Sequence, residues 1–310
     1  MRAPMDAAPA VTPVASRVDA ELLAYAGLTA ASLGWASAYV AGKLALAEMT
    51  PLTVAAWRFV VAALILVPFG VRGAPWREVR RVAGALSVLV ACGSVLYPWL
   101  FLLALSRTTA TNTALLIALN PVFTILLTPL IGERLSAQRL TGVALALLGA
   151  ATVITKGEVR HLIDLSFNSG DLLAVAAAAI WSVFNLASRR VVLHVSPAFT
   201  NSVVYVVGGV ALCLLALPEH PWVQVRAASA AAIGGVVIMA VGASVFSGQF
   251  FLMGVRTLGV SRAVVFIYLM PVLTAVLSAA LLGERFGPAQ LLGGAAVLAG
   301  VYWGTRARSV

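Results

Sequence analysis

The sequence contains little charge. Only 10% of its 310 residues are Asp, Glu, Lys or Arg, whereas 61% are hydrophobic. Soluble domains average about 25% charged and about 45–50% apolar residues, so a soluble fold would lack polar cover for this much apolar surface. A bilayer removes that difficulty, and a helix needs about 20 apolar residues to cross its hydrocarbon core. The composition therefore indicates an integral membrane protein that has the lipid bilayer as its solvent.

Histidine and cysteine are also scarce. His161, His194 and His220 lie in separate loops, and Cys92 and Cys213 each stand alone in an apolar run. These spacings suit neither a metal site nor a nucleophile paired with a base, so we expect no metal, no cofactor and no enzymatic activity. The net charge of +10 comes from basic residues scattered between apolar runs, which argues against nucleic acid as a partner.

Ten apolar runs bounded by proline, glycine or charge predict an all-α integral membrane fold of ten transmembrane helices. The runs lie near residues 22–46, 51–71, 82–105, 109–131, 138–156, 170–192, 197–217, 227–254, 258–282 and 288–305. The same pattern divides the chain into a flexible cytoplasmic tail, a first repeat, a connecting loop, a second repeat and a short second tail, over residues 1–21, 22–156, 157–169, 170–305 and 306–310.

Lys and Arg are distributed unequally between the two sides of these spans. With a cytoplasmic N-terminus, 14 of them fall in cytoplasmic segments and 6 in outer segments, while Arg58 lies inside a span. Cytoplasmic loops of membrane proteins carry an excess of Lys and Arg. The bias predicts that both termini are cytoplasmic.

The chain also repeats itself. The segment 119–124, Leu-Asn-Pro-Val-Phe-Thr, matches 269–274, Leu-Met-Pro-Val-Leu-Thr, at an offset of 150 residues. Near the start of each half, Trp35, Lys43 and Pro51 match Trp181, Arg189 and Pro197 at an offset of 146. The repeat unit covers about five spans. An odd unit repeated in tandem must enter the membrane the second time from the opposite side, which predicts two inverted repeats, a common architecture of secondary transporters.

Motifs in both halves resemble the EamA family of the drug/metabolite transporter superfamily. The first half opens with Leu-Gly-Trp-Ala-Ser at 33–37, and the second with Gly-Asp-Leu-Leu-Ala at 170–174 followed by Trp181. Each half ends in a helix-central proline, a Gly-Glu pair, a glutamine and a glycine: Pro121, Gly132, Glu133, Gln138 and Gly142, then Pro271, Gly283, Glu284, Gln290 and Gly293.

The resemblance implies a transporter in a bacterial-type inner membrane that exports small metabolites such as amino acids. It further implies that helices 1–4 and 6–9 surround a central cavity while helices 5 and 10 are peripheral. A drug exporter or a lipid-linked sugar flippase of the same superfamily is an alternative, as are a channel and, from another class, a membrane enzyme. The sequence does not distinguish a monomer from a homodimer.

Polar and aromatic residues within the spans are the candidates for a substrate cavity, because polar groups at lipid depth normally face the protein interior. They are Trp35, Tyr39, Arg58, Tyr97, Asn120, Trp181, Asn185, Ser244, Gln249 and Tyr268. The tryptophans serve equally well as core packing. Arg58 is an intramembrane charge and hence a functional candidate, with snorkelling or a bond to backbone carbonyls as the structural alternative.

Four residues are candidate helix kinks or hinges, namely Pro98, Pro121, Gly248 and Pro271. Interrupted helices at corresponding points of two halves indicate a binding site, although they also serve packing.

Lys43 and Arg189 end equivalent helices, where they favour the helix dipole or attract a substrate carboxylate. The Gly-Glu-Arg turn at 132–134 is interpreted as helix termination with a local ion pair. All 11 acidic residues lie outside span centres, so the sequence favours downhill movement over a buried carboxylate relay.

Overall fold

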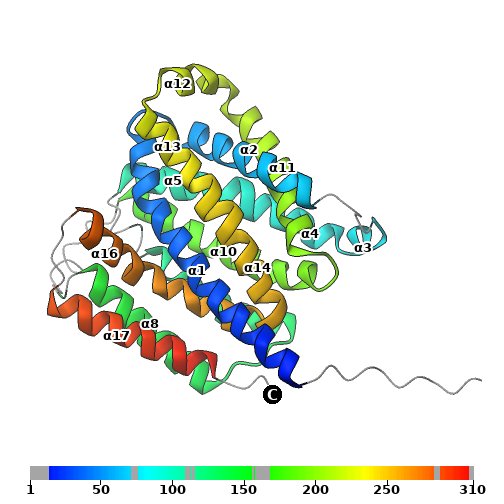
Figure 1. Ribbon diagram of the computed structural model, residues 1–310, viewed down its shortest axis with the longest axis vertical. Helices are drawn as coiled ribbons and strands as arrows, with labels where there is room; N and C mark the ends of the chain where they lie inside the picture. The colour runs from blue at the N-terminus through cyan, green and yellow to red at the C-terminus, as the bar shows by residue number, and fades with distance from the viewer. Residues whose placement is uncertain are drawn as a thin grey trace, which may run out of the picture.

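The computed structural model describes residues 14–70, 76–108, 113, 116–155, 157, 168–282 and 287–306. Helices and short connections make up all of these residues, without a strand (Figure 1). Cis peptide bonds are likewise absent from this part of the chain.

Long helices, some of them interrupted, make up the first half. Its elements are α1 (Val14–Leu46), α2 (Pro51–Gly70), α3 (Trp76–Arg81), α4 (Ala83–Val90), the π-helix η1 (Ala91–Leu96), α5 (Tyr97–Arg107), α7 (Asn120–Leu127), the 3-10 helix η2 (Thr128–Ile131) and α8 (Ala137–Ile154). The π-helix joins α4 and α5 into one apolar segment of 25 residues, Ala83–Arg107.

The second half repeats this order. Its elements are α10 (Ser169–Val192), α11 (Pro197–Ala216), the 3-10 helix η3 (Leu217–Glu219), α12 (Pro221–Ala227), α13 (Ala230–Ile238), the π-helix η4 (Met239–Phe246), α14 (Ser247–Leu258), α15 (Val260–Val265), the 3-10 helix η5 (Phe266–Tyr268), α16 (Leu269–Leu282) and α17 (Pro288–Thr305). Here the π-helix again lies within one continuous segment, Ala230–Leu258.

Five segments among the described residues are long and apolar enough to cross a membrane, and further apolar helices are shorter. Large apolar side chains such as Leu148 and Leu292 are about two-thirds exposed on the outer surface, as lipid contact would require. One boundary differs from the sequence prediction, because α1 begins at Val14 and so includes residues 14–21, which were assigned to the flexible tail. Residues 1–13 lie outside the described part.

Helix starts follow side-chain capping rules. The Asn168 side chain accepts hydrogen bonds from the N–H groups of Gly170 and Asp171, and the Asp171 carboxylate accepts the N–H of Asn168 in return. This capping box begins the second repeat. At the start of α11 the Ser196 side chain accepts the N–H of Phe199, with Pro197 in the first helical turn.

Equivalent helices of the two halves pack against each other in antiparallel pairs. Helix α2 packs along α11, and α8 along α17 (Figure 1). In the second pair Gly142 meets Gly304, and Gly149 meets Gly293. The end of one helix therefore lies at the start of its equivalent. Glycine at these crossings lets the two backbones approach closely.

The first helix of each half packs against the interrupted segment of the other half. Helix α1 packs against α13, η4 and α14 of the second half, and α10 packs against α4, η1 and α5 of the first. Reciprocal contacts of this kind are what a two-fold relation between two repeats produces. The helix pairing thus extends the sequence repeat into three dimensions.

Lys43 and Arg189 bind backbone carbonyls instead of facing the protein centre. Lys43 Nζ donates to the carbonyl of Leu105, at the end of α5, over 2.8 Å. Arg189 donates to the carbonyl of Val255, the repeat equivalent of Leu105, over 2.7 Å. Each cation therefore stabilises the C-terminal end of a neighbouring helix. Lys43 and Arg189 therefore act on a helix end, as the sequence suggested, but this is the end of a neighbouring helix and not of the helix that carries them.

Candidate functional site

A cavity opens between the two halves, with roughly 840 Å³ of space not filled by atoms, part of it open solvent. The lining includes nine pairs of repeat-equivalent residues, namely Trp35 and Trp181, Ala38 and Phe184, Arg58 and Val204, Phe59 and Tyr205, Gly93 and Ala243, Pro98 and Gly248, Phe101 and Phe251, Ile117 and Ile267, and Asn120 and Met270. Tyr39, Tyr97 and Asn201 complete it.

This paired lining places the cavity between corresponding surfaces of the repeats. Pairs with a first member before residue 60 follow the offset of 146, and the others follow the offset of 150. The lining takes residues from the first two long helices of each half, α1, α2, α10 and α11, and from the interrupted segments. It takes none from α8 or α17. That distribution agrees with the cavity position that the family resemblance implies.

Both π-helices line this cavity at equivalent places. η1 contributes Gly93 and η4 contributes Ala243, and each π-helix is followed within two residues by Pro98 or Gly248. π-Helical turns are rare and occur frequently at functional sites. A Cβ atom at Gly248 would lie 2.4 Å from the Tyr205 hydroxyl oxygen, so a larger residue at this position would have to displace the Tyr205 side chain.

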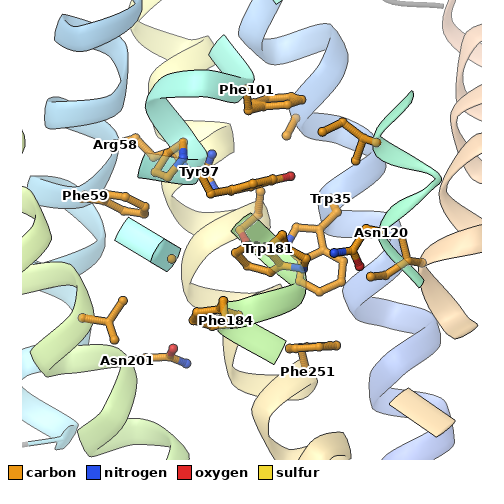
Figure 2. A pocket seen from close by; sticks show the side chains of 18 of the residues that line it. Trp35, Arg58, Phe59, Tyr97, Phe101, Asn120, Trp181, Phe184, Asn201 and Phe251 are labelled. Atoms are coloured by element: carbon orange, nitrogen blue, oxygen red, sulfur yellow. Dashed lines mark hydrogen bonds between the residues drawn. The ribbon is translucent and has the colours of Figure 1, made fainter. Parts of the chain in front are cut away.

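Stacked aromatic rings form the centre of the site (Figure 2). Trp181 lies with its ring centroid 4.3 Å from Phe184 and 4.4 Å from Tyr97, and it meets Trp35 edge-on at 6.1 Å. The indole N–H of Trp35 donates to the carbonyl of Ala243 over 3.0 Å, which ties the first helix to the π-helix η4. Flat apolar surface is therefore the main feature that the cavity offers.

Arg58 provides the cavity's positive charge. It is only 8% exposed, and its Nε donates to Ser244 Oγ over 2.7 Å. Its guanidinium carbon lies 5.3 Å from the centroid of the Phe59 ring. Figure 2 shows Arg58 and Phe59 at one side of the cavity, with the rings of Tyr97 and Trp181 next to each other at its centre. The bond to Ser244 replaces the sequence alternatives of snorkelling and of binding backbone carbonyls.

The two asparagine candidates are hydrogen-bonded to each other. Asn185 Nδ2 donates to Asn120 Oδ1 over 3.2 Å and to Thr124 Oγ1 over 3.0 Å. Asn120 Nδ2 donates to the carbonyl of Ala178 over 3.0 Å. Asn120 lines the cavity, whereas Asn185 supports it from behind. Their bonds connect α7 to α10.

The predicted site residues fall into two groups. Those that line the cavity are Trp35, Tyr39, Arg58, Tyr97, Pro98, Asn120, Trp181 and Gly248. Those that the structure places elsewhere are Pro121, Asn185, Ser244, Gln249, Tyr268 and Pro271. Ser244 holds Arg58, and Tyr268 is fully buried with a hydroxyl that has no partner among the described residues.

Helical hydrogen bonding is irregular beside both helix-central prolines. A turn at 118–119 precedes Pro121, which stands in the first turn of α7. The 3-10 helix η5 ends just before α16, which contains Pro271 near its start. Ile117 and Ile267, which precede each proline by four residues, both line the cavity. The interruptions therefore adjoin the site.

The lining residues that sequence reasoning missed include five aromatic residues and one asparagine, namely Phe59, Phe101, Phe184, Tyr205, Phe251 and Asn201. The signal that could have found two of them was present, since Phe101 and Phe251 are repeat equivalents and Phe101 lies four residues after Tyr97 on the same helix face. Asn201 carries a further feature, a buried amide nitrogen with no hydrogen-bond partner among the described residues.

Two carboxylates of the first repeat bind helix starts of the second repeat outside the cavity. Glu133 accepts the N–H groups of Val260 and Ser261 over 3.1 and 3.2 Å, and also the Ser261 hydroxyl. Glu48 accepts the N–H and hydroxyl of Ser229, each over 2.6 Å. Both contacts lie at the start of a helix, where negative charge is favoured.

The predicted ion pair between Glu133 and Arg134 is wrong. The two side chains form no salt bridge, although both belong to the described residues. Gly132 does terminate the helix, with φ of 80°. The carboxylate instead reaches the start of α15, where backbone N–H groups lack partners within their own helix. Glu284, its equivalent, lies outside the described residues.

Comparisons with known proteins identify relatives along most of the chain. The sequence model of the EamA-like transporter family matches residues 22–155 and 168–305. The uncharacterized transporter YyaM of Bacillus subtilis is 28% identical over 84% of this chain and 86% of its own. A Streptantibioticus cattleyicolor protein named "Probable terminal-alkyne amino-acid exporter" is 28% identical, covering 86% of this chain and 88% of its own.

A solved crystal structure has the same fold. Its TM-score is 0.71 at 20% sequence identity, and the alignment covers 93% of this chain and 97% of the other. At this identity the likeness concerns the fold alone. The names of the family and of both relatives describe transporters and not enzymes.

Proposed function

Because this chain belongs to the EamA-like transporter family, we propose that it exports small metabolites such as amino acids by alternating access. The observation that carries this proposal is the paired lining of the cavity. Two similar halves that line one site with corresponding residues can exchange conformations, and the site then faces each side of the membrane in turn.

The antiparallel pairing of α2 with α11 and of α8 with α17 supports inverted repeats. A two-fold axis along the helices would place equivalent helices parallel, whereas antiparallel equivalents require an axis across them. For helices that span a bilayer, that axis lies in the membrane plane. Ten spans are an even number of crossings and would leave both termini on the same side of the membrane. The excess of Lys and Arg favours the cytoplasmic side of the inner membrane.

The two carboxylate contacts fit alternating access. Glu48 follows the first predicted span and Glu133 the fourth, so three crossings separate them and they belong on opposite sides of the membrane. Each joins one repeat to the other. We interpret the Glu48–Ser229 contact as an outer latch and the Glu133–Ser261 contact as an inner latch, each of which must break when the cavity opens on its side.

The amino-acid assignment has two supports. One relative of this chain is named as an amino-acid exporter. In addition, the cavity combines aromatic surface around Trp181 with hydrogen-bonding groups on Arg58, Asn120 and Asn201. Such a mixture suits a small solute that has both polar and apolar parts.

Reconstitution into proteoliposomes tests the proposal. We expect saturable, trans-stimulated uptake of at least one solute from a panel of amino acids and their derivatives, with dyes and drugs as controls. The Trp181→Ala variant should lose this uptake because it removes the central ring of the site. Trp303→Ala is the matched control, since Trp303 is 53% exposed on α17. Uptake that never saturates would favour a channel, and no uptake of any amino acid or derivative would refute the substrate class.

A further inference from the structure

Arg58 carries a charge that the protein does not neutralise. Within the part of the chain that the structure describes, no carboxylate lies at ion-pair distance from it, and the cavity lining contains no acidic residue. Its equivalent in the second repeat is Val204, which lines the same cavity. The repeat fold therefore accepts an apolar side chain at this position and does not require the cation.

The donors of Arg58 are only partly used. A guanidinium has five N–H groups, of which the one on Nε is bound to Ser244. The terminal nitrogens have no hydrogen-bond partner among the described residues. Their planar arrangement matches the two oxygens of a carboxylate. The bond from Nε to Ser244 fixes the direction of the guanidinium, so these donors are already oriented before a ligand arrives.

Further groups at the cavity are donors without a partner. The Trp181 indole N–H and the Asn201 amide nitrogen have no partner in the described structure, whereas the equivalent indole N–H of Trp35 is bound to Ala243. Asn120 Oδ1, an acceptor at the cavity, already receives a bond from Asn185. The site thus offers one positive charge and unbound donors to whatever fills it.

We propose that the cargo is an organic anion whose carboxylate pairs with Arg58 and whose aromatic or other flat apolar body stacks against Trp181. This inference rests on the proposed function and narrows it. A monoanion neutralises the cavity, whereas a zwitterion leaves one uncompensated positive charge and a cation leaves two. Burial makes such charges costly. Amino acids whose amino group is acylated or absent therefore fit better than free amino acids, and cationic derivatives do not fit.

The test uses four probes with one skeleton and different charge: N-acetylphenylalanine, phenylalanine, phenylalaninamide and N-acetylphenylalaninamide. We expect saturable, trans-stimulated transport of N-acetylphenylalanine in proteoliposomes, slower transport of phenylalanine, and none of phenylalaninamide. In Arg58→Gln the KM for N-acetylphenylalanine should rise about tenfold or more, because charge-assisted hydrogen bonds are lost. The advantage of the anion over the neutral diamide should disappear at the same time.

Two further variants separate recognition from folding. Ser244→Ala frees Nε but keeps the charge, so the order of preference should persist even if the KM changes. Arg256→Gln removes an exposed arginine outside the cavity and should alter neither KM nor preference. The melting temperature of each purified variant shows whether it folds.

The outcomes for this inference and for the proposed function differ. Saturable transport with equal preference for the cation and the anion, or with a KM unaffected by Arg58→Gln in folded protein, would overturn the inference and leave the transporter assignment in place. Absence of saturable transport for all four probes and for the amino-acid panel would overturn both.

Discussion

The inner latch allows a quantitative test of alternating access. Glu133 accepts two backbone N–H groups and one hydroxyl at the start of α15, and Ser261 provides two of these three donors. The Glu133→Gln variant keeps a similar shape but loses the charge and one of the two acceptor oxygens. It should therefore weaken the state in which the cytoplasmic ends of the two repeats are joined.

The expected size of the effect follows from the bonds lost. Hydrogen bonds to charged groups contribute about 1.5–3 kcal/mol, and loss of a helix N-cap costs about 0.5–2 kcal/mol. Because Gln still accepts one bond, we expect the closed state to lose about 1–2 kcal/mol relative to the inward-open state. That change raises the ratio of open to closed molecules by a factor of about 5–30.

Labelling of a single cysteine measures this ratio. Ala263 lies on α15 and is completely buried, so Ala263→Cys in a background with Cys92→Ala and Cys213→Ala should react slowly. In inside-out membrane vesicles, a membrane-impermeant maleimide should label this cysteine about 5–30 times faster when Glu133→Gln is also present.

The outer latch supplies the control. Glu48→Gln makes the same chemical change in a contact of the same kind, with Ser229, on the predicted opposite side. It should not accelerate cytoplasmic labelling of Ala263→Cys. Equal labelling rates with and without Glu133→Gln, or equal acceleration by both variants, would refute the assignment of the two contacts to opposite gates.

Two further predictions concern the peripheral helices and pH. Gly149→Leu should lower protein stability by about 1–3 kcal/mol in thermal melting, because its Cβ would lie 2.6 Å from the carbonyl oxygen of Gly293. Gly234→Leu, at a site with nothing within 4 Å of the added Cβ, should not, and similar losses in both would contradict close α8–α17 packing. Hydrogen bonds from the Ser229 hydroxyl and, to a smaller extent, from the Ser229 N–H lower the pKa of Glu48. The contact should therefore stabilise the protein fully above the ordinary carboxyl pKa, and this stabilisation should be lost as the pH falls through the lowered pKa. The difference in melting temperature between wild type and Ser229→Ala should therefore shrink between about pH 7 and pH 3, and a constant difference would exclude this linkage.

Most of the fold could be predicted from the amino-acid composition and the internal repeat. A chain with 61% hydrophobic residues cannot cover itself in water, and matched segments at offsets of 146 and 150 identify two similar halves. These properties lie along the chain and need no knowledge of contacts. The repeat also identified the pair Trp35 and Trp181 and the pair Pro121 and Pro271, because the two members of each pair occupy matching positions in the two halves.

The tertiary structure decided which face of each helix meets the cavity. Asn185 and Asn120 resemble each other as polar residues within spans, yet the first supports the second and only the second lines the site. The partner of Arg58 is Ser244, which is 186 residues away in the chain. Hydrophobic periodicity cannot assign such faces when a helix contacts both lipid and protein, since both surroundings are apolar.

The same limit explains Glu133. Its sequence neighbours suggested a local ion pair, but its partners are Val260 and Ser261 in the other repeat. The sequence by itself determined that this is a membrane protein of two related halves, because apolar content and repetition depend only on the order of the residues and not on their contacts. Only the tertiary structure decided that Arg58 is buried at the cavity without a counter-charge among the described residues, since charge compensation depends on which side chains the packing of helices brings together.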